Sequence, residues 1–410
     1  METTQLFAQG LGLSDPFHIT LVELLDVEDS NSKSLHIHID FYKGSTFKAS
    51  DGNSYKVYDT RQRSWRHLDF FQHTCYLHCG VPRVKKADGK VEQIVMPWSR
   101  SGSGFTLLFE SYIMQMIKLE MPVNCLARQV GEYADRLWTI FNYYVTGAYE
   151  DKDHKEVKQL GVDETSAKKG HNYVTTAVDM EKREVVHVTK GKDKQSIENI
   201  RVYLESKGCP AEQIEELSLD MSPSFIAGGL DQFPKAALTF DRFHVKKLLN
   251  KAVDEVRKIE RKEYKELKGH KYIFLRNKEN LKPEKQKELE HLLKLYPTIG
   301  KSYRFKVLFD EFWDIADSKQ AEIYLNNWCE KVMDSKIFPM QKFVKTIKAH
   351  WYGIINYSVS RITNGILEGI NTKIQLAKRR ARGYRKIENF INMIYLIAGN
   401  LNLNHPHKTR

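Results

Sequence analysis

Cysteine and long apolar runs are scarce in this chain of 410 residues, and each absence argues against a class of protein. The five cysteines are odd in number and scattered, unlike the disulfide framework of a small secreted domain. No run is long and apolar enough to cross a bilayer, and the chain does not start with a basic segment followed by an apolar core. We therefore expect a soluble protein of a reducing cytoplasm with no membrane partner.

Acidic residues are outnumbered, since 64 Lys and Arg against 52 Asp and Glu leave a net charge of +12. Such an excess favours a polyanionic partner, of which nucleic acid is the first to consider. Basic composition also occurs on ordinary solvated surfaces, so the positions of the charges have to decide. The length is too great for one ordinary domain, and we expect two or three units.

Residues 1–102 are predicted to form a β-rich module, because short aromatic and β-branched segments alternate there with turn signals. The expected strands are His18–Val27, Leu35–Asp40, Val57–Tyr58, Arg63–Phe71, Cys75–Val84 and Val91–Met96. Cys75 and Cys79 share one of these strands with His78, and His73 lies two residues before it. Alternation sends His78 to the opposite face from Cys79, so we expect no structural zinc there.

Residues 103–147 change to helical spacing and predict a helix-turn-helix. After a first helix, Val123–Gln129 can form a second, and Gly131 supplies a turn before a third, Tyr133–Tyr144. The later helix of such a motif lies in the major groove of DNA, which makes Arg136 the candidate for a base or phosphate contact. An ordinary helical hairpin has the same spacing and remains an alternative.

The charged segment Ala148–Gln159 suits an exposed linker, with a domain boundary near residue 150. Three strands and then alternating helices and strands follow, which is the order of the α/β ribonuclease H-like fold. A long stretch dense in Lys, Glu and Leu, broken at Lys282-Pro283 and Tyr296-Pro297, predicts an α-helical insertion. The first part of the core, the insertion and the second part of the core are expected at 159–245, 246–357 and 358–402.

Two aspartates are expected at the ends of apolar strands, Asp163 after Leu160–Val162 and Asp220 after Leu217–Leu219. The carboxyl ends of adjacent parallel strands converge, and two such carboxylates can share two Mg²⁺ or Mn²⁺ ions for displacement at phosphorus. An Asp at a strand end is more commonly a loop cap. Asp241 is a rival that ends the next strand outward, and we expect it and His244 to support the site or the structure.

A third ligand should come from the final helix, where Glu368 is the best placed acid. The isoleucines at 362, 366, 370 and 374 recur every four residues and predict a buried stripe. Glu368 lies off that stripe, so helical phase alone leaves it in solvent.

The order of several short blocks is more specific than any single motif. The blocks are Arg63–Leu68, Val81–Val84, Met121–Val123, Gly161–Glu164, Lys169–Tyr173, Leu219–Phe225, Phe240–Val245, Asn364–Asn371 and Arg379–Tyr384. Together they resemble the DDE transposases of the ISL3 insertion-sequence family, over nearly the whole chain. The resemblance implies that Asp163, Asp220 and Glu368 bind the metal.

The resemblance also implies a bacterial, nucleoid-associated enzyme that binds the terminal inverted repeats of its element and cleaves and transfers DNA strands. Its partners would be double-stranded repeat and target DNA, in a homodimer or larger synaptic complex. A ribonuclease H-like nuclease that does not join DNA, or a DNA-binding regulator with structural carboxylates, are the alternatives. Members of the family usually carry a cysteine-rich zinc module, but the corresponding stretches here, 47–52 and 85–89, lack cysteine.

A basic segment without acids follows the helix of Glu368. Its seven basic residues are Lys373, Lys378, Arg379, Arg380, Arg382, Arg385 and Lys386. This position suits phosphate contacts, which add affinity but carry little sequence information.

Overall fold

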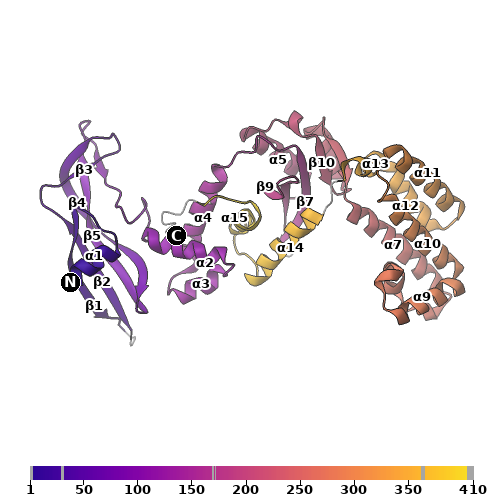
Figure 1. Cartoon of the computed structure of the whole chain (residues 1–410), viewed down its shortest axis with the longest axis horizontal. Helices are drawn as coiled ribbons and strands as arrows, with labels where there is room; N and C mark the ends of the chain where they lie inside the picture. The colour runs from indigo at the N-terminus through magenta and orange to yellow at the C-terminus, as the bar shows by residue number, and fades with distance from the viewer. Residues whose placement is uncertain (1–2, 29–31, 169, 171, 362–364, 404–410) are drawn as a thin grey trace. The chain divides into compact units, whose positions relative to one another are not determined.

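The computed structural model describes residues 3–28, 32–168, 170, 172–361 and 365–403. These residues divide into two units, Met1–Ala148 with Asn402–Arg410, and Tyr149–Leu401. Figure 1 labels their helices and strands. No helix within the described ranges is both long and apolar enough to span a membrane.

The first unit contains a sheet with the strand order β1-β2-β5-β4-β3, and β6 pairs with β5. Its elements are α1 Thr3–Gly10, β1 Phe17–Asp26, β2 Lys33–Phe41, β3 Thr46–Lys48, β4 Ser54–Phe70, β5 His73–Lys85 and β6 Val91–Gln93. The sequence predicted two strands, Val57–Tyr58 and Arg63–Phe71, where the structure has the single strand β4. The polar residues between them continue the strand because β5 pairs along nearly its whole length.

Three helices follow in the same unit, α2 Leu107–Lys118, α3 Val123–Gln129 and α4 Ala134–Glu150. Thr106 begins α2 by accepting the Phe109 N–H on its hydroxyl oxygen, which is a standard N-cap. Gly131 makes the turn before α4 with a φ of 66°, which costs glycine little. Helix α4 continues past the predicted end at Tyr144, because Val145 is fully buried and extends its apolar face.

The second unit begins with an antiparallel meander, followed by two short parallel strands. Its elements up to the sheet edge are β7 Gln159–Lys168, β8 Asn172–Asp179, β9 Glu184–Lys190, α5 Lys194–Ser206, η1 Ala211–Gln213, β10 Glu216–Leu219, α6 Pro223–Gln232 and β11 Ala237–Phe240. The strand order is β11-β10-β7-β8-β9, with β10 parallel to both β7 and β11. The predicted series of three strands, helix, strand, helix and strand is confirmed.

Two expectations near the start of this unit are wrong. The segment Ala148–Gln159 is not a fully exposed linker, because His154 and Val157 are buried. Asp163 does not end its strand, because β7 continues to Lys168 by pairing with β8 beyond the point where β10 stops.

The two faces of this sheet are covered by different helices. Gly229 of α6 packs on Leu217, Leu219 and Leu238, so α6 lies over one face. Gly161 of β7 contacts Leu367 of α14, and because Gly161 is paired with Ser218, both lie on the opposite face. Asp220, two residues after Ser218, therefore points to the face of the sheet that α14 covers.

Residues 242–360, here called the helical region, separate β11 from α14. The region contains α7 Arg242–Glu260, η2 Lys265–Leu267, α8 Lys271–Leu275, η3 Lys278–Asn280, α9 Pro283–Leu295, α10 Pro297–Phe312, α11 Ser318–Asp334, α12 Phe338–Ala349 and α13 Trp351–Ser360. The predicted breaks are confirmed, since Pro283 and Pro297 occupy the first turns of α9 and α10.

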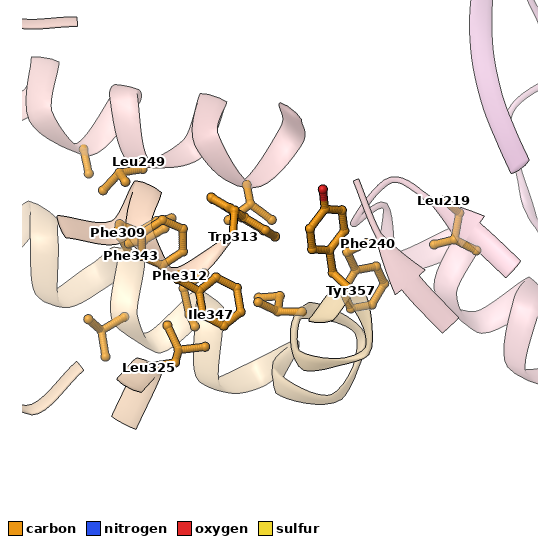
Figure 2. Packing of buried hydrophobic residues seen from close by; sticks show 14 of the residues in the cluster. Leu219, Phe240, Leu249, Phe309, Phe312, Trp313, Leu325, Phe343, Ile347 and Tyr357 are labelled. Carbon is orange, nitrogen blue, oxygen red and sulfur yellow. The ribbon is translucent and has the colours of Figure 1, made fainter. Parts of the chain in front are cut away.

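The core of the helical region is continuous with that of the sheet. Figure 2 shows Leu219 and Phe240 from the strands in one cluster with Trp313 and Phe343. The last helix, α13, returns to the sheet edge, where Asn356 Nδ2 donates to the carbonyl of Leu238 at 2.9 Å. The helical region is thus packed against β11 at both ends of its sequence.

Two helices complete the second unit, α14 Gly365–Arg380 and α15 Ile387–Ala398. The predicted isoleucine stripe is correct for Ile370 and Ile374, which are buried, but Ile366 is only half-buried and Leu367 is buried instead. A strict four-residue repeat drifts around a helix of 3.6 residues per turn, which explains the change. Ile362 lies outside the described residues. Helix α15 was not predicted separately and packs on β9, where the Tyr395 hydroxyl accepts the Val188 N–H at 2.9 Å.

Candidate active site

The strand register brings three aspartates to the same level of the sheet. Ser218 of β10 pairs with Gly161 of β7, so Asp220 is level with Asp163 two residues further on. Leu219 pairs with Phe240 of β11, so Asp241 is level with Asp220. Neighbouring strands are about 4.8 Å apart, and level residues on parallel strands share a face. The three carboxylates therefore lie in a row on the face that α14 covers.

Asp163 is held on both carboxylate oxygens. Its Oδ1 accepts the Glu164 N–H at 2.7 Å, and its Oδ2 accepts Asn371 Nδ2 of α14 at 2.5 Å. Burial raises the pKa of Asp163 to about 6, and the negative charge of Asp241 acts in the same direction. A cation beside Asp163 would offset this penalty and keep the carboxylate ionised at neutral pH.

Asp220 and Asp241 both anchor the starts of the helices that follow them. Asp220 Oδ1 accepts the Ser222 N–H at 2.8 Å. Asp241 caps α7 by accepting the Phe243 N–H at 2.7 Å, and its other oxygen lies 2.8 Å from His244 Nδ1. Asp220 and Asp241 therefore both have the capping role that is expected of an Asp at the end of a strand.

His244 contacts Asp241 and lies within electrostatic reach of Asp220 and Asp163. Its hydrogen bond to Asp241 raises the pKa of the imidazole, and the charges of Asp241, Asp220 and Asp163 act in the same direction. Helix α7 begins at Arg242, two residues after the end of β11 at Phe240. The structure thus places Asp163, Asp220, Asp241 and His244 in one region of the sheet. The sequence predicted the approach of Asp163 to Asp220, with Asp241 and His244 as structural or supporting residues.

Glu368 does not join this group. It is exposed in the first turn of α14, directly after Leu367, which packs on Gly161. No group of three or more His, Cys, Asp and Glu within the described ranges is arranged to hold a metal ion. Residues 362–364, immediately before α14, lie outside those ranges. The structure therefore leaves Glu368 where helical phase predicted it.

Sequence reasoning missed the residues that join α14 to β7. Leu367 packs on Gly161, Asn371 donates to Asp163, Gln375 donates to Thr165 at 2.9 Å, and Lys378 donates to the Ser166 carbonyl at 2.6 Å; these contacts form a row along both elements. The helix and the strand run in the same direction. These helix residues are about four apart, which is the spacing of residues on one face of a helix. The sequence did not show that this face packs on β7.

The donor chemistry at this site suits a hard divalent cation. Carboxylate and amide oxygens are the ligands that Mg²⁺ and Mn²⁺ prefer. Asp163 and Asp220 supply carboxylates, and the carbonyl Oδ1 of Asn371 is buried without a hydrogen-bond partner in the described structure. The side chains of Asp163, Asp220 and Asn371 thus offer the type of oxygen ligand that such an ion binds. Glu368 lies outside this set.

Comparison with known proteins identifies the family to which the chain belongs. Residues 160–394, more than half of the chain, match a family model described as a transposase. Residues 96–145 match the helix-turn-helix domain of transposase family ISL3. The chain belongs to the ISL3 transposases.

Two relatives of this transposase are insertion-sequence proteins of known name. It is 25% identical to the transposase for insertion sequence element IS1001 of Bordetella parapertussis over 358 residues, which cover 82% of this chain and 84% of that protein. It is also 25% identical to the transposase for insertion sequence element IS1557 of Mycobacterium tuberculosis over 374 residues, 82% of each chain. The matches confirm an insertion-sequence transposase with a helix-turn-helix DNA-binding domain.

A buried glutamate organises the helix-turn-helix of the transposase. Glu110 of α2 is fully buried and accepts from Arg100 Nε at 3.0 Å, from Ser103 Oγ at 2.6 Å and from the Tyr144 hydroxyl at 2.7 Å. These partners lie before α2 and on α4. Glu110 therefore holds the first and third helices in their relative orientation.

Arg136, the predicted contact on α4, is partly engaged within the protein. Its guanidinium lies 4.3 Å from the centre of the Phe105 ring and pairs with Glu132. The side chain is still 44% exposed. It would have to exchange these contacts for a DNA phosphate or base.

The basic segment of the transposase is mostly exposed, as an interface to phosphates requires. Lys373, Arg379, Arg380, Arg382, Arg385 and Lys386 are all exposed. Lys378 differs, because its ammonium group donates to the Ser166 carbonyl and so helps to hold α14 on β7.

The predicted alternation along β5 is confirmed. Cys75 and Cys79 are buried in the hydrophobic core of the sheet, and burial raises the pKa of each thiol to about 12. His78 lies on the other face, where its Nε2 is 2.8 Å from His36 Nδ1. The two cysteines are therefore core residues in this transposase.

Proposed function

We propose that this transposase binds the terminal inverted repeats of its element and cleaves and joins DNA there by metal-dependent phosphoryl transfer. Asp163, Asp220 and Glu368 would be the catalytic carboxylates, on a ribonuclease H-like core interrupted by the helical region as an insertion. The observation that carries the proposal is the level placement of Asp163 and Asp220 on adjacent parallel strands. The strand order, with three antiparallel strands and two parallel ones at one edge, supports the fold assignment.

The aspartates and the glutamate would hold two Mg²⁺ or Mn²⁺ ions, which supply activation of the attacking oxygen and stabilisation of the leaving one. Asp163 enters this arrangement with its carboxylate already oriented by the Glu164 N–H and Asn371. Glu368 would complete the set by turning from solvent towards the row of aspartates, from a helix whose position on β7 is already fixed. Its exposed side chain is free of the buried packing around Leu367.

His244 and Asp241 support the reacting groups in this proposal. Asp241 holds His244 through Nδ1, which leaves Nε2 to donate to a DNA phosphate or a leaving oxygen. The hydrogen bond to Asp241 raises the pKa of His244, which favours the protonated imidazole. Water would attack first to nick the strand, and the resulting 3′-hydroxyl would attack target DNA in the transfer step.

The helix-turn-helix would carry the sequence-specific recognition, with Arg136 on α4 among its DNA contacts. The basic segment of residues 373–386 would hold the phosphates of the DNA end close to the carboxylates. Two ends have to meet before transfer, so we propose a homodimer or larger synaptic complex. Its substrate is double-stranded DNA, which puts the protein at the nucleoid in the bacterial cytoplasm.

The test is cleavage and strand transfer of terminal-repeat DNA by Asp163→Asn, Asp220→Asn and Glu368→Gln variants, with DNA binding measured in parallel. We expect each variant to bind the repeat but to lose cleavage by at least about 1000-fold, because each removes an ionised ligand. Retained cleavage in all three would exclude the triad. Cleavage without any joined product in the wild type would favour a nuclease, and binding without cleavage would favour a regulator.

A further inference from the structure

The hydrogen bond between Asn371 and Asp163 joins the helix of one proposed metal ligand to the strand of another. Asn371 Nδ2 donates to Asp163 Oδ2 at 2.5 Å, across 208 residues of sequence. Asn371 also follows Glu368 by three residues on α14, and side chains at this spacing lie on neighbouring parts of a helix surface. Asn371 thus contacts the Asp163 carboxylate from a position next to Glu368 on the surface of α14.

The chemistry of an amide suits this position better than that of a cationic side chain. Lys or Arg at 371 would orient Asp163 but would also neutralise its charge and compete with a metal ion. The neutral Asn371 amide orients the carboxylate and leaves its negative charge unpaired. Because the Glu164 N–H already holds the other oxygen, the two donors together fix the plane of the Asp163 carboxylate.

The second polar atom of Asn371 has no partner among the residues that the structure describes. Its carbonyl Oδ1 is buried and makes no hydrogen bond in the described structure. A buried acceptor left unsatisfied loses its hydration without compensation, so such atoms normally have a partner. A metal ion or a water bound to one would supply that partner at this site.

We propose that Asn371 is a positioning residue of the metal site. Its Nδ2 orients the Asp163 carboxylate, and its Oδ1 accepts a hydrogen bond from a water bound to the metal ion. The inference rests on the proposed function, because it requires a metal at Asp163. Groups that orient a metal ligand in this way change metal affinity without being the main ligands themselves.

Gln375 offers a matched control one turn further along α14. Its amide makes the equivalent contact to the next residue on the same face of β7, with Nε2 donating to Thr165 Oγ1 at 2.9 Å. Thr165 is not a proposed ligand. Loss of the Gln375 contact therefore disturbs the packing of α14 on β7 without touching Asp163.

The experiment measures Mn²⁺ binding to the full-length protein without DNA, by electron paramagnetic resonance and calorimetry, with circular dichroism as the check on folding. We expect Asn371→Ala and the similarly sized Asn371→Leu to weaken Mn²⁺ binding roughly 10- to 100-fold. Gln375→Ala should bind as the wild type does. Equal binding by folded Asn371 and Gln375 variants would overturn the inference.

Asp163→Asn separates this inference from the proposed function. If it leaves Mn²⁺ binding unchanged, the metal is not at Asp163 and the proposed function fails. If it abolishes binding while the Asn371 variants bind normally, only the role of Asn371 fails. Should the Asn371 variants not fold, a crystal structure of the wild type with Mn²⁺ decides. Asn371 should then still contact Asp163 with its Oδ1 at the ion or an ion-bound water, and an Asn371 turned away from both would overturn the inference.

Discussion

Gly161 of β7 lies directly against Leu367 of α14, with no space for a side chain between them. A Cβ on Gly161 would lie 2.4 Å from Met180 Sδ and 3.1 Å from Leu367 Cδ2. We expect Gly161→Ala to push α14 away from β7 and to lower the free energy of unfolding by about 1–3 kcal/mol. Cleavage should fall more than stability explains, because the contact of Asn371 with Asp163 depends on the same packing.

Urea unfolding and a cleavage assay test this prediction together, and Gly369→Ala is the control. Gly369 is on the same helix but has no atom within 4 Å of an added Cβ. Replacing a helical glycine there should raise the stability by up to about 1 kcal/mol. If Gly161→Ala is as well tolerated as Gly369→Ala, the packing of α14 on β7 is not as close as the structure has it.

Glu110 should be essential to the helix-turn-helix. Glu110→Ala would leave Arg100, whose side chain is only 18% exposed, without its carboxylate partner. We expect a loss of about 3–5 kcal/mol in stability, as for other broken buried ion pairs. Terminal-repeat binding, measured by fluorescence anisotropy, should weaken with it. Asp135→Ala on the exposed side of α4 is the comparison, and similar stability of the two variants would contradict the role assigned to Glu110.

Acid should destabilise the second unit through His154. Burial lowers the pKa of His154 to about 4, below its ordinary value of 6.5. The unfolded chain therefore takes up a proton near pH 6.5 while the folded chain does not, and stability is lost as the pH falls from about 6.5 to 4. The loss is at most about 3 kcal/mol from this group. His154→Gln should show a shallower decline in urea unfolding over that range, and an unchanged decline would exclude His154 as its source.

The exposed members of the basic segment should control the salt dependence of DNA binding. Lys373→Gln combined with Arg385→Gln should weaken binding to every DNA sequence and reduce the slope of log affinity against log salt by about 2. Lys378→Gln should instead lower stability, because Lys378 donates to Ser166. Titrations at several salt concentrations distinguish the two, and an unchanged slope in the double variant would place the phosphate contacts elsewhere.

The strands and the approach of Asp163 to Asp220 could be predicted from the sequence, because apolar strands and their order follow from local patterns. The end of β7 could not, since it depends on pairing with β8 rather than on the residues around Asp163. The phase of α14 was partly wrong for a similar reason. Leu367 is buried instead of Ile366 because Gly161 leaves space for it, and that space is formed by a strand about 200 residues earlier in the chain.

The role of Asn371 was beyond reach from sequence, because an asparagine on a helix carries no signal until its partner is known. Glu368 illustrates the opposite case. Its proposed role depends on the family pattern, while both helical phase and the structure leave its carboxylate exposed. The assignment of Glu368 thus comes from the family pattern and not from the geometry of the site.

The separation of Asp163 from Asn371 by 208 residues also sets an order of events during synthesis. At about 5–20 residues per second, a ribosome needs roughly 10 to 40 seconds to proceed from one to the other. During this interval the helix-turn-helix has already emerged, whereas the segment that completes the site has not. A chain interrupted within residues 242–360 would therefore keep α2 to α4 and lack both Asn371 and Glu368. Under the proposed function, such a fragment would occupy DNA ends without cutting them.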